Sequence, residues 1–192
     1  MKKLLFIITL IVLIFVSCKN GNHLEFKNIE MKGTVSEFVS KLKKAGFEEL
    51  ASMCNVFMLN GKFLNKDCAV MIIQEKEKDI SQLSVYSMPD NRNLTWEVIR
   101  THYNYVQNEL TKLYGKPTIS TYGFDKPYSE ENWYDGIKKG ACRYYSYWEL
   151  DNGKIFVLIH DEFGAPVPCI IYSDKINCKK NNIDIPNFPK DF

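Results

Sequence analysis

The sequence is organised around one long amphipathic helix, which we predict within the stretch Leu94–Pro117. Apolar side chains recur there at spacings of three and four residues, which places them on one side of a helix. Thr95 is suited to cap the N-terminus, and Gly115 followed by Pro117 ends the helix. The predicted buried face comprises Trp96, Ile99, Tyr103, Val106, Leu110 and Leu113. Because strand-like segments precede and follow this helix, the sequence predicts an α+β domain.

The first 17 residues have the pattern of a signal peptide. Lys2 and Lys3 precede an apolar run that is too short to span a bilayer and that ends at Ser17-Cys18. A small residue directly before a cysteine resembles the lipobox of bacterial lipoproteins, which implies cleavage before Cys18 and acylation of that cysteine. The alternative is an ordinary secretory signal with an incidental cysteine. Because two or more acyl chains give stable anchoring, we predict a lipid anchor at Cys18.

The anchor sets the organisation of the remaining chain. We predict a signal peptide at 1–17, a lipidated polar tether at 18–23, a single domain at 24–176 and a tail at 177–192. The expected location is the cell envelope, where the lipid holds the protein on the outer membrane, on its periplasmic or surface side.

Charge argues against a nucleic-acid partner. Without Lys2 and Lys3, the 25 basic residues become equal in number to the 23 acidic ones, and no basic stripe is present to neutralise phosphates. The cysteines other than Cys18 are odd in number, so at least one thiol is expected to be free, and buried unpaired thiols are as compatible with the pattern as disulfides. No cysteine or histidine spacing fits a zinc site, and we expect neither a metal nor a cofactor.

The chain reads as two similar units. Thr34 and Glu37 have the spacing of a capping box, and they precede a shorter helix that Gly46 ends. Strand-like runs follow each helix, at 56–64, 68–74 and 83–86 after the first, and at 118–122, 142–150, 154–160 and 168–172 after the second, with a polar loop at 125–140. We therefore predict two α-β-β-β units that form one curved, mainly antiparallel sheet with the helices packed on one face.

Several segments resemble small, uncharacterised lipoproteins of Gram-negative gut anaerobes. The resemblance spans nearly the whole chain after the tether and rests on Phe26-Lys27-Asn28-Ile29, Gly33-Thr34, 37–47, Leu113-Tyr114-Gly115-Lys116-Pro117 and 142–150. It implies a fold similar to the β-lactamase-inhibitor-protein-like arrangement, in which two helix-and-sheet units place their strands in one curved sheet. It carries over no catalytic residues, and the fold analogy associates the chain with protein binding only.

A hairpin turn predicts which residues face outward. Asn152-Gly153 is the preferred pair for a two-residue turn, and it would pair Trp148 with Val157. Alternation then places Trp148, Leu150, Ile155, Val157 and Ile159 under the helices. The opposite set is expected to stay partly open and to form a protein-binding surface: Arg143, Tyr145, Tyr147, Phe156, Leu158 and His160.

Two alternatives to this surface remain open. The tail, with Ile183, Ile185, Phe188 and Phe192, could fold back over the second set, or a three-residue turn could exchange the two faces.

The sequence favours a non-enzymatic, membrane-anchored module that binds or assembles with a protein partner. No catalytic residue is assigned, because no nucleophile stands in a recognisable motif. The alternative is an envelope hydrolase with a site around His160, which adjoins Asp161 and Glu162 and could act in acid–base chemistry. Adjacent strand residues point to opposite faces, however, so a charged strand end explains the same three residues.

Overall fold

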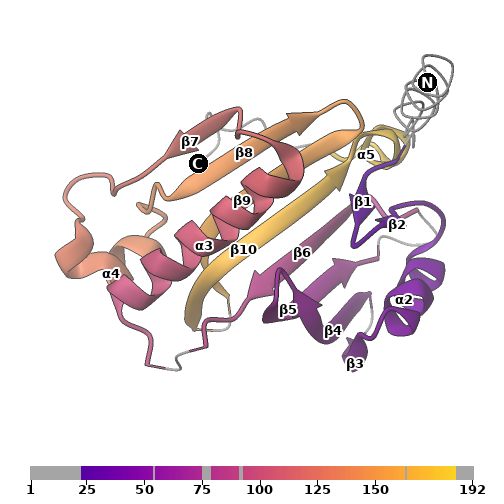
Figure 1. Cartoon of the computed structure of the whole chain (residues 1–192), viewed down its shortest axis with the longest axis horizontal. Coiled ribbons are helices and arrows are strands. Elements are labelled where there is room, and N and C mark those ends of the chain that lie inside the picture. Colours follow the sequence, from indigo (N-terminus) through magenta and orange to yellow (C-terminus); the bar gives the residue numbers. More distant parts are fainter. Residues whose placement is uncertain (1–22, 54, 75–78, 91–92, 163, 185–192) are drawn as a thin grey trace, which may run out of the picture.

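The computed structural model describes residues 23–53, 55–74, 79–90, 93–162 and 164–184, which form a mixed fold around one large antiparallel sheet (Figure 1). The predicted signal peptide and Cys18 lie outside these residues. The sheet has eight strands in the order β3-β4-β5-β6-β10-β9-β8-β7. Their bounds are β3 Glu48–Met53, β4 Val56–Phe63, β5 Lys66–Ile73, β6 Gln82–Ser87, β7 Ile119–Thr121, β8 Tyr145–Leu150, β9 Gly153–Glu162 and β10 Ala165–Asp174. A separate hairpin consists of β1 (Glu25–Phe26) and β2 (Ile29–Glu30).

Helices α2 (Val35–Lys44) and α3 (Trp96–Tyr114) begin at the predicted caps. The Thr34 side chain accepts a hydrogen bond from the Glu37 N–H, and the Glu37 carboxylate accepts one from the Thr34 N–H, which completes the capping box. Thr95 Oγ1 accepts from the N–H of the third residue of α3. Gly46 and Gly115 follow the two helices with φ of 92° and 81°, a region that glycine enters without steric cost.

Both helices lie on one face of the sheet, which we call the helix face (Figure 1). The predicted apolar face of α3 is buried there, with Ile99, Tyr103, Val106 and Leu110 inaccessible to solvent. Leu113 is an exception, because it is 57% exposed. Tyr114 takes the inward position in this last turn, and its hydroxyl oxygen lies 3.4 Å from that of Tyr172 in β10.

Four elements were not predicted. Strand β3 forms an edge of the sheet directly after α2, so the first helix is followed by four strands and not by three. Polar and apolar residues do not alternate regularly in β3, because Glu48 and Glu49 are adjacent and Leu50 is exposed. The sequence therefore does not show the pattern that is typical of a strand. Helix α4 (Trp133–Lys138) and a 3-10 turn (Glu130–Asn132) occupy the loop that we expected to be irregular. Helix α5 (Lys175–Asn181) follows β10 and crosses the predicted boundary between domain and tail at residue 176.

The β8–β9 hairpin turns one residue earlier than predicted. Asp151 and Asn152 occupy the turn, so that Trp148 pairs with Ile155 instead of Val157. Gly153 lies inside β9, where a Cβ would come within 2.4 Å of the carbonyl oxygen of a β10 residue. The predicted pairs are therefore wrong by two residues, but a shift of two leaves every side chain on its predicted face. The set expected under the helices lies there: Trp148, Ile155, Val157 and Ile159 are buried, and Leu150 is partly buried.

Candidate functional site

The face of the sheet opposite α2 and α3, which we call the far face, carries a continuous apolar surface. Alternate residues of neighbouring strands lie side by side in two adjacent rows that cross β5, β6, β10, β9 and β8. One row is Met71, Ser84, Ile171, Phe156 and Tyr147, and the other is Ala69, Tyr86, Cys169, Leu158 and Tyr145. We call these ten residues the far-face belt. It contains four of the six side chains predicted to form a binding surface.

The belt is less accessible than we expected. Tyr145, Tyr147 and Phe156 are 7%, 5% and 2% exposed, so the prediction that this set stays partly open is wrong for these three. The rings of Tyr147 and Phe156 stack with their centroids 5.0 Å apart, and the Lys154 ammonium lies 5.4 Å from the centroid of Tyr147. These neighbours cover the sides of the rings. Leu158 is partly buried.

A hollow of about 330 Å³ lies at one end of the belt, beside β8, β9 and α4. Arg143, Tyr145, Leu158 and His160 all line it, so the structure brings together four of the six predicted residues. His160 is exposed and Arg143 is half-buried, as expected for the margin of a surface. The other lining residues are Ile137, Lys138, Gly140, Cys142, Ile159 and Asp161.

Two basic side chains, Lys138 and Arg143, line this hollow, which we call the basic hollow. Arg143 forms an ion pair with Asp125. Asp161 contributes the opposite charge. Its Oδ1 is buried and has no hydrogen-bond partner among the described residues.

The lining of the basic hollow includes His160 and Asp161, the two residues named for the hydrolase alternative. Among the lining residues there is no serine or threonine. Cys142 is the remaining candidate nucleophile, and burial raises the pKa of its thiol to about 11, which keeps it protonated at neutral pH. Cys142 forms no disulfide, and neither do the buried Cys68 and Cys178.

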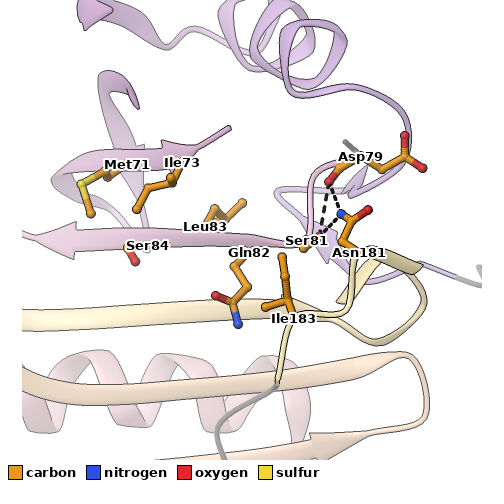
Figure 2. A pocket seen from close by; sticks show the side chains of 9 residues that line it. All are labelled: Met71, Ile73, Asp79, Ser81, Gln82, Leu83, Ser84, Asn181 and Ile183. Atoms are coloured by element: carbon orange, nitrogen blue, oxygen red, sulfur yellow. Dashed lines mark hydrogen bonds between the residues drawn. The ribbon is translucent and has the colours of Figure 1, made fainter. Parts of the chain in front are cut away.

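A second, smaller hollow of about 140 Å³ lies near the other end of the belt (Figure 2). Met71 and Ser84 of the belt line it together with Gln82 and with Ile183, which follows α5. Figure 2 shows the Ile183 side chain beside Gln82 at the start of β6. The chain after α5 therefore reaches the far face at this point.

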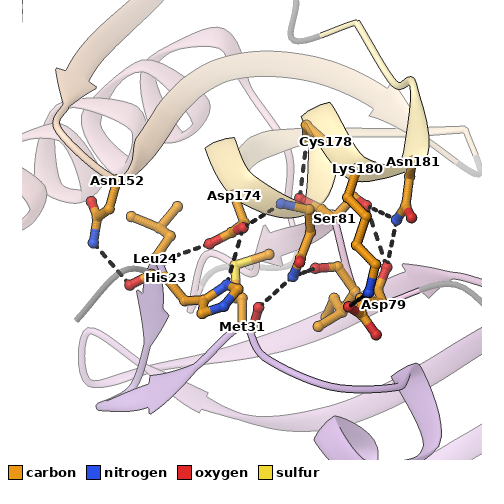
Figure 3. A network of polar contacts seen from close by, with 12 residues as sticks. His23, Leu24, Met31, Asp79, Ser81, Asn152, Asp174, Cys178, Lys180 and Asn181 are labelled. Carbon is orange, nitrogen blue, oxygen red and sulfur yellow. Dashed lines mark hydrogen bonds and ion pairs between the residues drawn. The ribbon is translucent and has the colours of Figure 1, made fainter.

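A buried polar network joins the start of the described chain to α5 (Figure 3). The Asp174 carboxyl group accepts hydrogen bonds from the N–H of Leu24 at 2.6 Å and from the N–H of Asn177 at 2.8 Å. His23 Nδ1 lies 3.3 Å from the same group, and the Asn152 side chain donates to the His23 carbonyl. The sequence predicts that His23 belongs to the tether, but the structure places it against the domain.

A buried pair of polar side chains connects α3 to the sheet. Ser87 Oγ lies 3.0 Å from His102 Nε2, and both side chains are buried on the helix face. Neither lines the two hollows of the far face. The predicted buried face of α3 does not include His102, because that face was chosen by its apolar residues. His102 follows Ile99 by three residues and therefore lies on the same side of the helix. We interpret this pair as a structural contact between helix and sheet.

Burial lowers the pKa of His102 below its usual value of 6.5. At pH values between this lowered pKa and about 6.5, His102 is protonated more in the unfolded chain than in the folded one. The free energy of unfolding therefore increases with pH in this range. We expect acidification through this window to lower the free energy of unfolding, and the substitution His102→Gln to make this pH dependence weaker. Urea denaturation at a series of pH values measures both slopes.

Asn108→Gln, on the exposed side of α3, supplies the control for this measurement. It exchanges one neutral side chain for another and should leave the pH dependence of the wild-type protein unchanged. Equal slopes for His102→Gln and wild type would contradict the assignment of this pH dependence to His102.

Comparisons with protein-family models, with curated proteins and with solved structures found no match. The resemblance to envelope lipoproteins therefore stays a prediction from the residues. Within the part of the chain that the structure describes, no helix is both long and apolar enough to cross a bilayer. Over the same residues, no group of three or more His, Cys, Asp and Glu side chains is placed to hold a metal ion.

Proposed function

We propose that this protein is a lipid-anchored module of the cell envelope that binds another protein through the far-face belt. The observation that carries the proposal is the apolar belt across five strands, in which Met71, Ile171 and Leu158 are only partly buried, although Tyr145, Tyr147 and Phe156 are not accessible. Helices α2 and α3 occupy the opposite face, and α4 and α5 contact the ends of β9 and β10 (Figure 1). Apolar centres with aromatic residues and a charged margin are typical of protein-recognition surfaces.

We further propose that the fold consists of two related units, α2 with β3–β6 and α3 with β7–β10. The last strands of the two runs, β6 and β10, pair with each other at the centre of the sheet. Outward from this pair, the strands of the first unit follow in the order β6-β5-β4-β3 and those of the second in the order β10-β9-β8-β7. Each unit therefore runs from its last strand at the centre of the sheet to its first strand at the edge. This order supports the proposed similarity to the β-lactamase-inhibitor-protein-like arrangement and the prediction of one shared, curved sheet.

The anchoring half of the proposal rests on Ser17-Cys18 and on the position of His23. Because His23 contacts Asp174, only residues 19–22 separate the predicted lipid site from the domain. Five extended residues from Cys18 to His23 span at most about 17 Å. A protein anchored at Cys18 would therefore hold its domain, with Asp174 and α5 nearest, close to the membrane surface.

Lipidation of Cys18 is tested by measuring the intact mass of the mature protein. We expect the wild-type protein to be recovered from membrane extracts with a mature chain that begins at Cys18 and carries acyl groups, because its leader resembles that of lipoproteins. The substitution Cys18→Ala should abolish both the added mass and the membrane association. A wild-type protein that is released in soluble, unlipidated form would overturn the proposed location.

Protein binding is tested by capture from solubilised envelopes with matched variants. Leu158→Asp places a charge in the belt, whereas Leu113→Asp places the same charge on the exposed side of α3, where Leu113 is 57% exposed. We expect wild type and Leu113→Asp to retain the same protein partner and Leu158→Asp to lose it. Equal retention by the two variants, with both folded, would show that the belt is not the binding surface.

A further inference from the structure

We propose that one end of the domain docks on an anionic phospholipid surface, where Leu113 and Ile176 enter the lipid interface and lysines of α5 contact the headgroups. This end is formed by His23, the last turn of α3 and α5, and we call it the chain-start end. The docking rests on the proposed lipid anchor at Cys18. It goes further than the anchor because it assigns the residues that meet the bilayer and the direction in which the domain stands.

The first observation is that the chain start is fixed to α5 (Figure 3). The N–H of Leu24 donates to the Asp174 carboxyl group at 2.6 Å, and His23 Nδ1 lies 3.3 Å from the same group. Asp174 is the N-cap of α5, so this helix begins beside the first described residue. The five steps from Cys18 to His23 span at most about 17 Å. A protein anchored at Cys18 therefore brings the start of α5 within this distance of the bilayer.

The second observation is the outer face of α5. Lys175 and Lys179 are four residues apart, and Ile176 lies beside them on the same side of the helix. All three side chains are exposed, Ile176 to 40%. The inner face is buried against the domain and comprises Asn177, Cys178 and Asn181. Interfacial helices combine lysines with apolar side chains in this way, because the ammonium groups reach the headgroups while the apolar groups enter the acyl boundary.

The third observation is a second exposed apolar side chain at the same end. Leu113 lies in the last turn of α3 and is 57% exposed. It lines a hollow of about 650 Å³ together with His23 and Asn152. His23 therefore adjoins both this hollow and the start of α5. Burial of Leu113 and Ile176 in a lipid interface removes apolar surface from water on both elements that adjoin the chain start.

Charge favours an anionic surface for α5. The helix contains three lysines and no acidic residue. Asp79 pairs with Lys180 at 2.6 Å, and the exposed Asp151 is a further acidic neighbour, whose carbonyl lies 3.4 Å from Lys175 Nζ. Lys179 has no ion pair with another described residue. Each lysine close to an anionic bilayer strengthens association about fivefold, which is little for a free protein but enough to orient a domain that an anchor already holds there.

Docking by the chain-start end leaves the other candidate surfaces clear of the bilayer. Strands β9 and β10 extend for ten residues, or about 33 Å, away from Gly153 and Asp174 at this end. Helix α4 and the basic hollow lie at the opposite end of these strands (Figure 1). The far-face belt crosses the strands between the two ends, so a protein partner can reach it while the domain is docked.

Lysine acetylation on vesicles tests the contact. The lipidated mature protein is reconstituted into vesicles of phosphatidylcholine with phosphatidylglycerol, and into vesicles of phosphatidylcholine alone. A membrane-impermeant acetylating reagent is added, and the products are mapped by mass spectrometry. The exposed Lys139, which follows α4 at the opposite end, is the internal reference. Relative to Lys139, we expect Lys175 and Lys179 to react about fivefold more slowly on the anionic vesicles than on the neutral ones. Salt at about 1 M, which screens charges beyond about 3 Å, should remove this difference.

Matched variants test the apolar part of the contact. Leu113→Asp and Ile176→Asp place a charge at the proposed interface, whereas Leu50→Asp places the same charge on the edge strand β3, where Leu50 is 56% exposed. All three side chains are exposed, so the denaturation midpoints should stay close to the wild-type value. On anionic vesicles, we expect the first two variants to lose the protection of Lys179 and Leu50→Asp to keep it.

Two results would overturn the docking. The first is equal relative acetylation of Lys175 and Lys179 on anionic and neutral vesicles. The second is protection that weakens as the protein is diluted in the lipid, because this is the result expected if a second copy of the chain covers the surface.

The outcomes separate this docking from the proposed function. A wild-type protein without acyl groups would overturn the anchor and the docking together, whereas an anchored protein with unprotected lysines would overturn the docking alone. The belt and the chain-start end are different surfaces. Leu158→Asp should therefore lose the protein partner and keep the lysines protected, and Leu113→Asp should keep the partner and lose the protection.

Discussion

Replacing Leu110 by alanine should lower the free energy of unfolding by about 2–5 kcal/mol. Leu110 is fully buried between α3 and the sheet, in the same cluster as Val106 and Tyr103. Truncation removes favourable burial of apolar atoms, and it leaves a cavity that the neighbouring strands can fill only in part. Equilibrium denaturation in urea or guanidinium, with the slope checked for constancy, measures the loss.

Asn108 provides the control on the same helix, because it lies on the exposed side of α3. Asn108→Ala should change stability by no more than about 0.5 kcal/mol. A midpoint for Leu110→Ala that equals the wild-type value would mean that α3 does not pack on the sheet through this face.

Replacing Asp174 by alanine should lower the free energy of unfolding by about 2–4 kcal/mol. The Asp174 carboxyl group is fully buried, caps α5 through the Asn177 N–H and accepts a second hydrogen bond from the N–H of Leu24. Its removal leaves two buried backbone donors without their acceptor, which costs their desolvation in addition to the lost hydrogen bonds. We expect faster hydrogen exchange at the amides of Leu24 and Asn177 together with the lower stability.

Asp67 is the matched control, since its side chain is 79% exposed and its ion pair with Lys62 is long, at 3.8 Å. Asp67→Ala should leave the denaturation midpoint unchanged. If Asp174→Ala behaves like Asp67→Ala, the network in Figure 3 does not hold the start of the domain to α5.

Local interactions determined the parts of the fold that the sequence predicts well. The caps at Thr34 and Thr95 and the glycines that end both helices act within four residues of the groups they satisfy. The buried face of α3 follows from the helical period, but the prediction omits the buried His102 and is wrong where Tyr114 replaces Leu113 as the inward side chain. Such signals can be read without knowledge of any distant contact.

Strand alternation determined the faces of the β8–β9 hairpin, although the turn was misplaced. Because side chains alternate with a period of two, an error of two residues in pairing left Tyr145, Tyr147 and Phe156 on the predicted face. Alternation does not say what lies above a face, however. The burial of these three side chains depends on contacts beyond the hairpin, and the sequence predicted them to be partly open.

The tertiary structure alone decided which residues meet across the sheet. The far-face belt exists because β6 pairs with β10, which places Tyr86 beside Cys169 although the two residues are 83 positions apart in the chain. Asp174 likewise looks like any surface aspartate in Ser-Asp-Lys until the N–H of Leu24, 150 residues earlier, is brought to it. Contacts of this kind gain their free energy only after distant segments have come together, so no local pattern of residues encodes them in readable form.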